Sequence, residues 1–332
     1  MSGPCVDIHC HHIPPELIDL IRMDGSSHSI EAMGDGAATR VSFAERGATQ
    51  ALPEGMLDLE GRLQWMDARG IDIQVLSPWI DFSAYVLDPD DGAWLARALN
   101  EFMAEAAATH PDRFRAMASV PLQEPELAAE ELAHAVKALE MTGVEIATSV
   151  RDRELDDDVL TPFWSAVETL NVLVLIHPTG SMASDRLSRY FLTNIVGNPA
   201  EETTAAAHLI FGGVLERHPR LKICLTHGGG FLPYQIGRQD RGFASKSDLT
   251  ANRLTHAPSH FIRSFWYDTI THSTEALRFL VDRVGTDRVI LGSDYPFPMG
   301  DPDPITTVTE TGIQGDAADA ILSRNALEAL GT

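Results

Sequence analysis

The sequence has few cysteines, and their positions exclude two common structural devices. Cys5, Cys10 and Cys224 are the only ones in 332 residues, they form no CxxC pair, and their number is odd. Neither a disulfide framework nor a zinc ribbon is therefore supported. Reduced thiols are typical of cytoplasmic proteins, and we expect a cytoplasmic location.

Positive charge and long apolar runs are also scarce. The chain carries 25 Lys and Arg against 48 Asp and Glu, a formal net charge of −23, which disfavours binding to nucleic acids and anionic membranes. No apolar run is long enough to span a bilayer, and the first ten residues, MSGPCVDIHC, lack the basic and apolar regions of a signal peptide. We expect neither a nucleic-acid partner nor a membrane partner.

The glycine-rich GxGxxG turn of a doubly wound nucleotide-binding sheet is absent after the first apolar run. The chain instead repeats one unit, a short β-branched run followed by a longer amphipathic segment. Candidate strands span residues 6–11, 73–77, 115–120, 144–147, 172–177, 222–227, 265–268 and 289–293. Candidate helices span residues 59–69, 91–110, 124–141, 162–170, 201–217, 274–283 and 316–330. Eight strands alternating with helices predict an α/β protein with a (β/α)8 TIM barrel.

One stretch departs from the repeat. Residues 23–56 are rich in Gly, Ser and Ala and contain a short alternating run, 39–43. We interpret them as a small insertion or flap after strand 1, at the barrel end where active-site loops lie. The prediction is therefore a single barrel domain over residues 1–332 that carries this insertion.

Two histidines stand at the end of the first strand. Residues two apart in a strand point to the same side, so His9 and His11 project together while Ile8 and Cys10 face the other way. The end of a first barrel strand lies at the mouth, where such folds place their chemistry. Neutral imidazoles suit zinc and related divalent metals.

Three later strands also end in a polar group. His177 ends an apolar run before a Pro-Thr-Gly turn, His227 precedes three glycines with room for a ligand, and Asp294 ends the eighth strand. A single histidine at such a place is more often a hydrogen-bonded core residue than a ligand. Four apolar runs that end in His or Asp at one barrel end are harder to explain by packing, because the groups would be poorly solvated. The pattern favours a bound cation.

Several motifs resemble a known family. They are Asp7-Ile8-His9-Cys10-His11, MDARGID at 66–72, VPLQ at 120–123, His177-Pro178, HGGG at 227–230 and LGSDYPFP at 291–298. Together they resemble the metal-dependent amidohydrolase superfamily, and in particular its aminocarboxymuconate-semialdehyde decarboxylase-like branch. The resemblance implies that His9, His11, His177 and Asp294 bind Zn2+, or another divalent ion such as Mn2+ or Co2+. It further implies that His227 is an acid/base outside the ligand set, that Asp294 shares the catalytic role, and that the protein is a homodimer.

The resemblance also suggests substrate contacts. Arg238 matches an arginine that the decarboxylase branch uses to bind a substrate carboxylate, and a guanidinium suits that task. A second substrate arginine of the branch is replaced here by Gln50, with Arg46 one turn earlier, so the substrate need not be identical. A hydroxybenzoate-type acid is an alternative, with Phe297, Trp79 and Phe191 as apolar walls. Asp268 is placed to support a ligand imidazole, and His272 lies shortly after the same strand.

Three functions fit these residues. The first is a metal-dependent, non-oxidative decarboxylase of a small unsaturated or aromatic carboxylic acid. The second is a hydrolase or hydratase that acts on a ring-cleavage product or lactone with the same ligands. The third is a metal-stabilised binding protein without turnover, which the free His227 beside an open metal position disfavours.

Overall fold

The computed structural model describes residues 3–179, 185–250 and 253–331, and its centre is one sheet of parallel strands. Eight strands follow each other around this sheet in chain order. They are β1 (Val6–His11), β4 (Ile73–Ser77), β5 (Phe114–Ala118), β6 (Gly143–Ala147), β9 (Leu173–His177), β10 (Lys222–Leu225), β11 (Phe265–Asp268) and β12 (Val289–Ile290). The predicted number and direction of strands are confirmed.

The first and last strands close the sheet on itself. The amide of Ile8 donates to the carbonyl of Leu291 at 3.0 Å, and the amide of Asp294 donates to the carbonyl of His9 at 2.7 Å. A parallel bridge joins Cys10 to Tyr295. These contacts complete a (β/α)8 barrel, as predicted.

Three strands end earlier than predicted: β5 ends at Ala118 and not at residue 120, and β10 and β12 are also shortened. β10 ends at Leu225 and not at His227, because His227 and Gly228 take positive φ values of 48° and 63° and turn the chain away. β12 ends at Ile290 and not at residue 293, because the amide of Ser293 bonds the Asp7 carboxylate at 3.0 Å. The deviations of β10 and β12 lie where the chain enters the barrel mouth.

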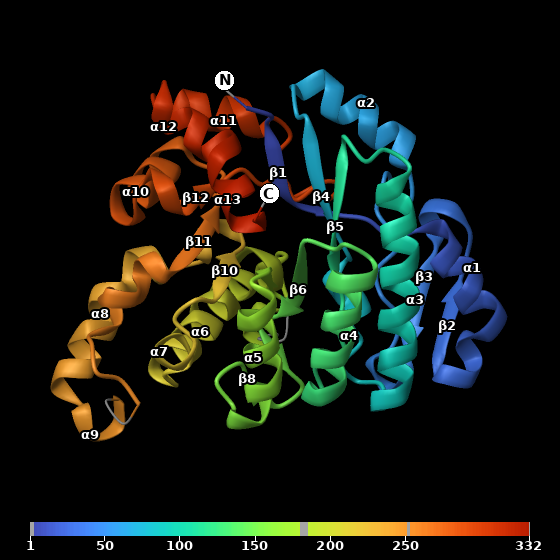
Figure 1. Cartoon of the computed structure of the whole chain (residues 1–332), viewed down its shortest axis with the longest axis horizontal. Coiled ribbons are helices and arrows are strands. Elements are labelled where there is room, and N and C mark those ends of the chain that lie inside the picture. Colours follow the sequence, from blue (N-terminus) through green and yellow to red (C-terminus); the bar gives the residue numbers. More distant parts are fainter. Residues whose placement is uncertain (1–2, 180–184, 251–252, 332) are drawn as a thin grey trace.

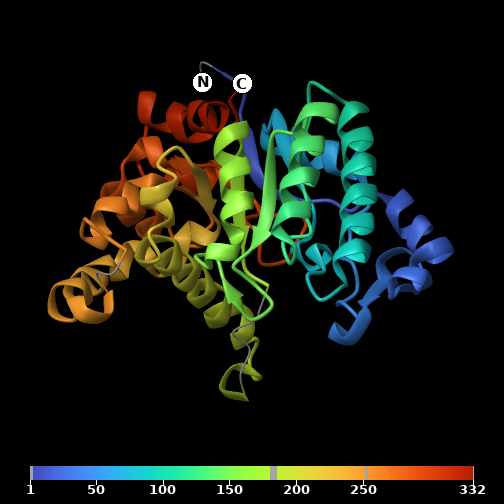
Figure 2. The ribbon, with the colours of Figure 1, turned by 60° about the horizontal axis from the view of Figure 1, so that its bottom comes forward.

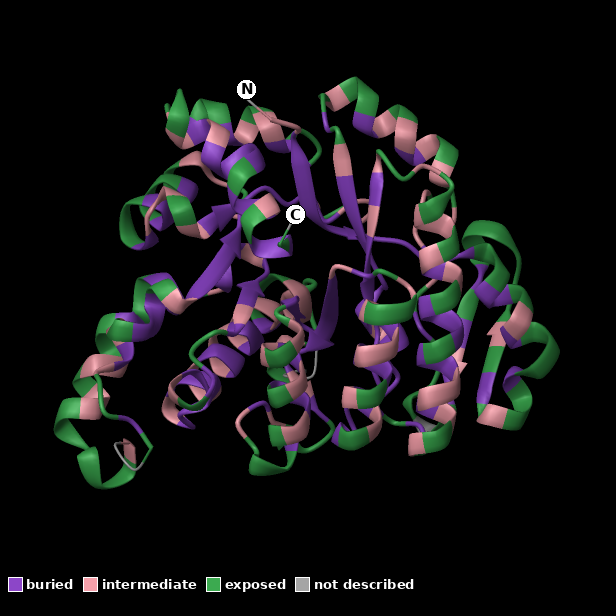
Figure 3. Ribbon diagram, viewed as in Figure 1, coloured by how far each residue is buried: buried purple, intermediate pink, exposed green. Residues whose placement is uncertain are grey.

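Helices surround the sheet (Figure 1). The longer ones are α2 (Leu59–Arg69), α3 (Pro89–Ala108), α4 (Pro125–Ala138), α5 (Thr161–Leu170), α6 (Asn198–Phe211), α8 (Leu232–Ser245) and α10 (Thr274–Val284). Asp58 caps the start of α2 by accepting from the amide of Gly61 at 2.9 Å, and Gly70 ends the helix at φ 72°. Figure 3 shows that the strands are buried while the helices expose their outer faces.

Two predicted helices are interrupted. The segment 201–217 divides into α6 and α7 (Val214–Arg217), because Gly213 takes a φ of 72°. The segment 316–330 divides into α12 (Asp316–Asp319), a π-helical turn at Ala320–Arg324, and α13 (Asn325–Leu330). The helices α1 (Pro15–Asp24), α8, α9 (Ser247–Thr250) and α11 (Pro304–Glu310) are additions to the predicted set.

The segment between α1 and α2 forms a small antiparallel hairpin on the flank of the barrel, on the other side from α8 (Figure 1). Its strands are β2 (Ile30–Met33) and β3 (Arg40–Phe43), and Ile30 pairs with Phe43. A second hairpin joins β7 (Ser149–Val150) to β8 (Arg153–Glu154). A role of residues 23–56 as an active-site flap stays a prediction.

Both chain ends lie on one side of the barrel (Figure 2). That side is the one from which β1 starts, so the carboxyl ends of the parallel strands point away from it. The mouth is therefore built by the loops that follow the strands.

Among the described residues, no helix is both long and apolar enough to cross a membrane.

Candidate metal centre

Three histidines present the same ring nitrogen to one point in the barrel mouth. Nδ1 of His9 lies 2.7 Å from Oδ2 of Asp268, which accepts its proton. Nδ1 of His11 donates to the carbonyl of Pro78 at 2.9 Å, and Nδ1 of His177 donates to that of Pro178 at 2.8 Å. Because Nδ1 holds the proton in each ring, Nε2 keeps its lone pair for a ligand.

The carboxylate of Asp294 lies beside these nitrogens. Its Oδ1 is 3.2 Å from Nε2 of His11 and 3.6 Å from Nε2 of His9. Ligand atoms of His9, His177, His227 and Asp294 all lie within 4.8 Å of one another. Asp294 takes a φ of 58°, a strained conformation for a non-glycine residue, which directs its side chain into the mouth.

The unpaired atoms of this group fit a divalent cation. Nε2 of His9, Nε2 of His11 and Oδ1 of Asp294 are buried and have no hydrogen-bond partner. Buried polar atoms without partners are rare and call for an explanation. Imidazole nitrogens and a carboxylate oxygen form a donor set that zinc and similar ions bind.

Burial and mutual contacts set the charges of the group. Burial lowers the pKa of His9 and lowers that of His177 well below its usual value, so both rings are neutral. Burial alone would raise the pKa of Asp294, but the neighbouring rings of His11, His227 and His9 hold it well below its usual range. Burial lowers the pKa of His11, but the carboxylates of Glu145 and Asp294 raise it above its ordinary value. The centre thus combines the neutral imidazoles of His9 and His177 with an ionised carboxylate, protonation states that suit a metal.

His227 is held from the side opposite the metal ligands. Its Nδ1 lies 2.6 Å from Oε1 of Glu202, which is buried on α6, and its Nε2 lies 3.8 Å from Oδ2 of Asp294. The hydroxyl of Thr226 donates to the same Glu202 oxygen. Burial lowers the pKa of His227, but Glu202 and Asp294 together raise it well above its usual value. The two carboxylates thus favour the protonated form of His227, whose Nε2 lies on the side of Asp294.

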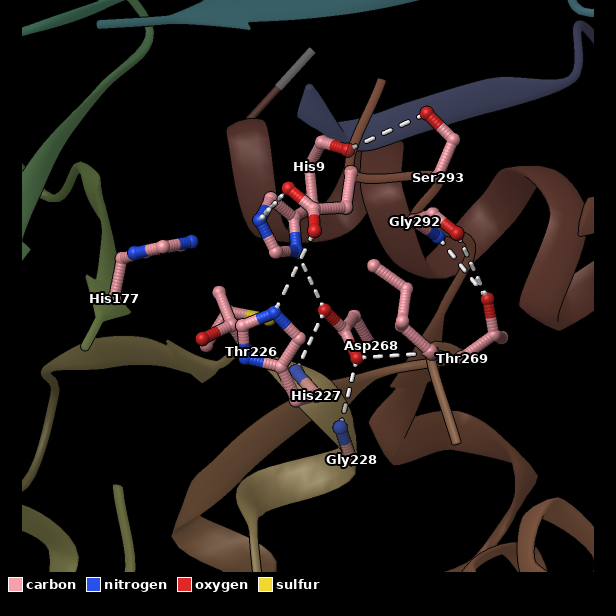
Figure 4. A network of polar contacts seen from close by, with 12 residues as sticks. His9, His177, Thr226, His227, Gly228, Asp268, Thr269, Gly292 and Ser293 are labelled. Carbon is pink, nitrogen blue, oxygen red and sulfur yellow. Dashed lines mark hydrogen bonds and ion pairs between the residues drawn. The ribbon is translucent and has the colours of Figure 1, made fainter. Parts of the chain in front are cut away.

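Asp268 at the end of β11 connects both parts of the site (Figure 4). Besides accepting from His9, its carboxylate accepts from the amides of His227 at 2.9 Å, Gly228 at 2.8 Å and Ile270 at 3.0 Å. Burial raises the pKa of Asp268, but these hydrogen bonds and the nearby histidines lower it overall. The structure brings this residue to the ring of His9, one of the imidazoles for which the sequence predicted a metal.

The three glycines after His227 pack tightly. All have positive φ, and a Cβ on Gly229 would lie 2.6 Å from the ring of Tyr267, while one on Gly230 would collide with the carbonyl of Pro199. Gly228 and Gly230 nevertheless line a cavity of about 500 Å³, which agrees with the predicted room for a ligand beside this backbone. The three glycines are needed because the chain turns in the left-handed region and lies against its neighbours.

Two buried carboxylates were missed from the sequence. Glu202 lies in a helix beside Glu201, and although both are buried, no pattern in the helix sequence indicated that either acid faces inward. Glu145 stands in the apolar strand β6, and an acid in a fully buried strand was a usable signal. Its Oε1 lies 3.8 Å from Nδ1 of His11, and burial raises its pKa to about 7.

A cavity of about 500 Å³ opens beside His227 and Asp294. His227 and Asp294 line it together with the apolar side chains of Phe231, Tyr234, Phe279 and Met299 and the polar side chains of Asn194, Asn198 and His272. Beside the metal ligands, the ring of Phe297 lies 5.3 Å from that of His11 and 5.6 Å from that of Trp79. The mouth can therefore accept an aromatic or unsaturated group.

Other residues singled out in the sequence lie apart from the cavity lining. Arg238 and Gln50 are exposed, and Arg46 is ion-paired with Asp81. Phe191 is 55% exposed. None of these residues is among those that line the described cavity.

Comparisons with known proteins agree with this fold. The pattern of the amidohydrolase family matches residues 6–332. The 2-amino-3-carboxymuconate-6-semialdehyde decarboxylase of Dictyostelium discoideum is 34% identical over 329 residues, which cover 98% of this chain and 91% of that protein. The gamma-resorcylate decarboxylase of Polaromonas sp. is 31% identical over 255 residues, 73% of this chain and 78% of the relative.

A solved structure has a fold similar to that of this chain. It is 5-carboxyvanillate decarboxylase from Novosphingobium aromaticivorans, complexed with manganese and 4-hydroxy-3-methoxy-5-nitrobenzoic acid. The two chains are 25% identical and superpose with a TM-score of 0.83 over 100% of this chain and 97% of the other. The similarity thus includes both the first and the last strand of the metal centre.

Proposed function

This chain belongs to the amidohydrolase family, in its aminocarboxymuconate-semialdehyde decarboxylase-like branch, and we propose that it is a metal-dependent, non-oxidative decarboxylase of a small unsaturated or aromatic carboxylic acid. One observation carries the proposal. His227 lines the same cavity as Asp294, whose Oδ1 is one of the unpaired donor atoms of the candidate metal centre. Decarboxylation needs a proton donor beside a group that holds the substrate oxygens.

We assign the metal to His9, His11, His177 and Asp294. Nε2 of His11 supports this choice over His227, because it is unpaired and lies nearer to Asp294, at 3.2 Å against 3.8 Å for Nε2 of His227. The two histidines also face different oxygens of the carboxylate. The ion is zinc, manganese or cobalt, and when bound it supplies a Lewis acid that stabilises negative charge on substrate oxygens.

The protein's own side chains would move the proton. Glu202 fixes the His227 ring with Nδ1 bonded, so that the proton on Nε2 points to the mouth. His227 transfers that proton to the substrate carbon that bears the carboxylate. The new C–H bond forms, the C–C bond to the carboxylate breaks with release of CO2, and its electron pair restores the substrate's conjugation. His227, now neutral, is reprotonated from water.

The cavity supports an uncharged ring or chain beyond the reacting carboxylate. Its described lining residues include three aromatic side chains at its outer part and neither Arg nor Lys. Phe297 and Trp79 provide a further apolar wall. Substrate contacts by Arg238, Arg46 and Gln50 stay predictions, as do the homodimer, the cytoplasmic location and the single domain over residues 1–332.

The test is release of CO2 from a panel of unsaturated and hydroxybenzoic acids by the metal-loaded protein. Decarboxylation of at least one acid, lost on metal removal and regained on metal addition, is the expected result. A hydrolase or hydratase would use the same ligands, and oxygen-18 from water would then enter the product. Water addition without CO2 across the panel would refute the decarboxylase.

A further inference from the structure

The first strand of the barrel is irregular at the point where the histidines begin. In the pairing of β1 with β4, Asp7 stands opposite Gln74 and Cys10 stands opposite Leu76. Three steps along β1 thus match two steps along β4. One extra residue in a strand is a β-bulge, and bulges beside active sites redirect side chains.

The bulge brings His9 to the inner face of the sheet. Ile8 packs in one apolar cluster with Leu175 of β9, and Leu175 shares its face with His177 because the two are two residues apart. The ring of His9 lies 5.2 Å from that of His177, on the same inner face. Ile8 and His9 therefore both point inward although they are adjacent. The prediction that Ile8 faces away from His9 is wrong, because regular alternation stops at the bulge.

Asp7 holds this bulge with a fully buried carboxylate. Its Oδ1 accepts from the amide of His9 at 3.2 Å and from the amide of Ser293 at 3.0 Å. Its Oδ2 accepts from the side-chain amide of Gln74 at 2.8 Å and from the hydroxyl of Ser293 at 2.5 Å. An ionised carboxylate has about four acceptor sites, and these four hydrogen bonds occupy them. Asp7 thus joins neighbouring segments of the chain and is not placed to bind an ion.

The segments that Asp7 joins carry two of the proposed metal ligands. His9 is one of them, and Ser293 directly precedes the other, Asp294. The carbonyl of His9 also accepts from the amide of Asp294 at 2.7 Å. Asp294 has a φ of 58°, a strained conformation that persists only where surrounding contacts fix it. A shift of the Asp7 carboxylate would therefore move both ligands.

A buried arginine balances the charge of Asp7 through an amide side chain. Nη1 of Arg62, on α2, donates to Oε1 of Gln74 at 3.1 Å, and Nε2 of Gln74 donates to Asp7. Nη2 of Arg62 donates to the carbonyl of His11, and its guanidinium carbon lies 4.7 Å from the centre of the Tyr295 ring. Buried charges need such partners. The compensation is built along the strand that carries both histidines.

We propose that Asp7 is a positioning residue of the metal centre. It holds the bulge of β1 and the segment after β12 in the arrangement that directs His9 and Asp294 to one ion. The inference rests on the ligand set proposed above. Asp7 contacts neither the ion nor the substrate, and acts through its hydrogen bonds to the main chain, as outer partners of a metal site do.

The experiment measures metal binding and does not depend on turnover. The full-length wild-type protein, Asp7→Asn and His11→Ala are freed of metal and titrated with Zn2+ or Mn2+ in competition with a chelating dye. The visible spectrum with Co2+ bound reports the geometry around the ion. Glu131→Gln is the matched control, because Glu131 on α4 is also a buried acid and is bonded to Arg97 and Asn100.

We expect Asp7→Asn to weaken the binding of both ions about 10- to 100-fold and to change the Co2+ spectrum. The NH2 group of the new side chain cannot accept from Gln74 or Ser293, so the two ligand segments lose part of their common support. His11→Ala removes a proposed ligand and should lose more affinity. Glu131→Gln should keep the affinity and the spectrum of the wild type.

Denaturant titration of the metal-free proteins separates positioning from general support of the fold. A less stable Asp7→Asn that keeps the metal affinity and Co2+ spectrum of the wild type would overturn the inference. If Asp7→Asn does not fold, Ser293→Ala takes its place, because it removes the hydroxyl that donates to Asp7. That variant should bind both ions severalfold more weakly, and wild-type affinity there would also overturn the inference.

The outcomes distinguish this inference from the proposals on which it rests. Wild-type affinity in His11→Ala would refute the ligand set, and the positioning role with it. Lost affinity in His11→Ala without any change in Asp7→Asn would overturn the positioning role alone. The expected affinities without CO2 release from any acid would refute the decarboxylase and leave the role of Asp7 standing.

Discussion

Oδ2 of Asp268 lies 2.7 Å from Nδ1 of His9 and also accepts from the amide of His227 at 2.9 Å. One carboxylate thus orients a proposed metal ligand and fixes the main chain of the proposed acid. The metal and the proton donor are therefore positioned together, because a shift of Asp268 would move both. This relationship leads to the first prediction.

Asp268→Asn should weaken the metal centre. The amide carbonyl can still accept from the main chain, but its NH2 group cannot accept from Nδ1 of His9, so the ring loses the tautomer that frees Nε2. Removing the hydrogen-bond partner of a metal-bound histidine typically weakens metal binding about 10- to 100-fold. Chelator competition measures the loss, with the exposed Asp287→Asn as control. Equal affinities in the two variants would contradict the assigned role.

His227→Asn should abolish most turnover while the metal stays bound. Asn tolerates the left-handed conformation that His227 adopts at φ 48°, so the backbone is preserved. General acid catalysis contributes about 10²- to 10⁴-fold, and kcat should fall within that range. Metal content of the purified variant is the second measurement. A loss of metal would indicate that His227 is itself a ligand.

Glu202→Gln should change the pH dependence of turnover. Burial lowers the pKa of His227 and the Glu202 carboxylate raises it, so the variant should have a His227 of lower pKa. The proposed mechanism needs the protonated ring, and activity is lost as pH rises through its pKa. The alkaline limb of kcat/KM should therefore move to lower pH in the variant. An unshifted limb with lower kcat would mean that Glu202 has only a structural role.

Gly229→Ala should destabilise the fold. The new Cβ would lie 2.6 Å from the ring of Tyr267, whose hydroxyl is held by the carbonyl of Ile262 at 2.7 Å, and the residue needs a φ of 75°. Overpacking and backbone strain together cost roughly 2–4 kcal/mol. Gly237→Ala is the matched control, because its Cβ meets nothing within 4 Å and it lies in α8, where Ala is favoured by up to about 1 kcal/mol. Denaturant titration of both variants gives the comparison.

His208→Gln should lower stability only at acidic to neutral pH. The hydrogen bond from His208 to Asp156, 2.8 Å long, raises the pKa of the histidine against the effect of burial. A histidine whose pKa is higher in the folded than in the unfolded protein stabilises the fold at pH values below its unfolded pKa of about 6.5. This stabilisation is lost as the pH rises through the folded pKa. Since the side chain of His208 is 38% exposed, the difference should stay below about 1 kcal/mol. Unfolding at pH 5.5 and pH 9 should show a difference that shrinks at the higher pH.

The barrel was predictable because the repeat of apolar runs follows directly from burial of parallel strands. The polar ends of those runs, at His9, His177 and Asp294, lie together in the structure because parallel strands end at one face. The breaks in the predicted helices were also foreseeable in part, since Gly212 and Gly213 stand at one of them.

The contacts between distant segments were not predictable. Glu202 reaches His227 only because α6 packs against the turn after β10, and a helix sequence does not reveal which acid faces inward. The ends of β10 and β12 were missed for a similar reason. There the chain leaves the strand to bond side chains of other strands, Asp268 and Asp7.

The contact between β1 and the segment after β12 has a consequence for biosynthesis. His9 is made near the start of translation, whereas Asp294, which bonds to the main chain of His9, is among the last 39 of 332 residues. A ribosome-bound chain that has not yet released residue 294 lacks one wall of the centre. The complete site therefore forms only after residue 294 has been made, and a chain that stops short of that residue lacks the carboxylate of Asp294.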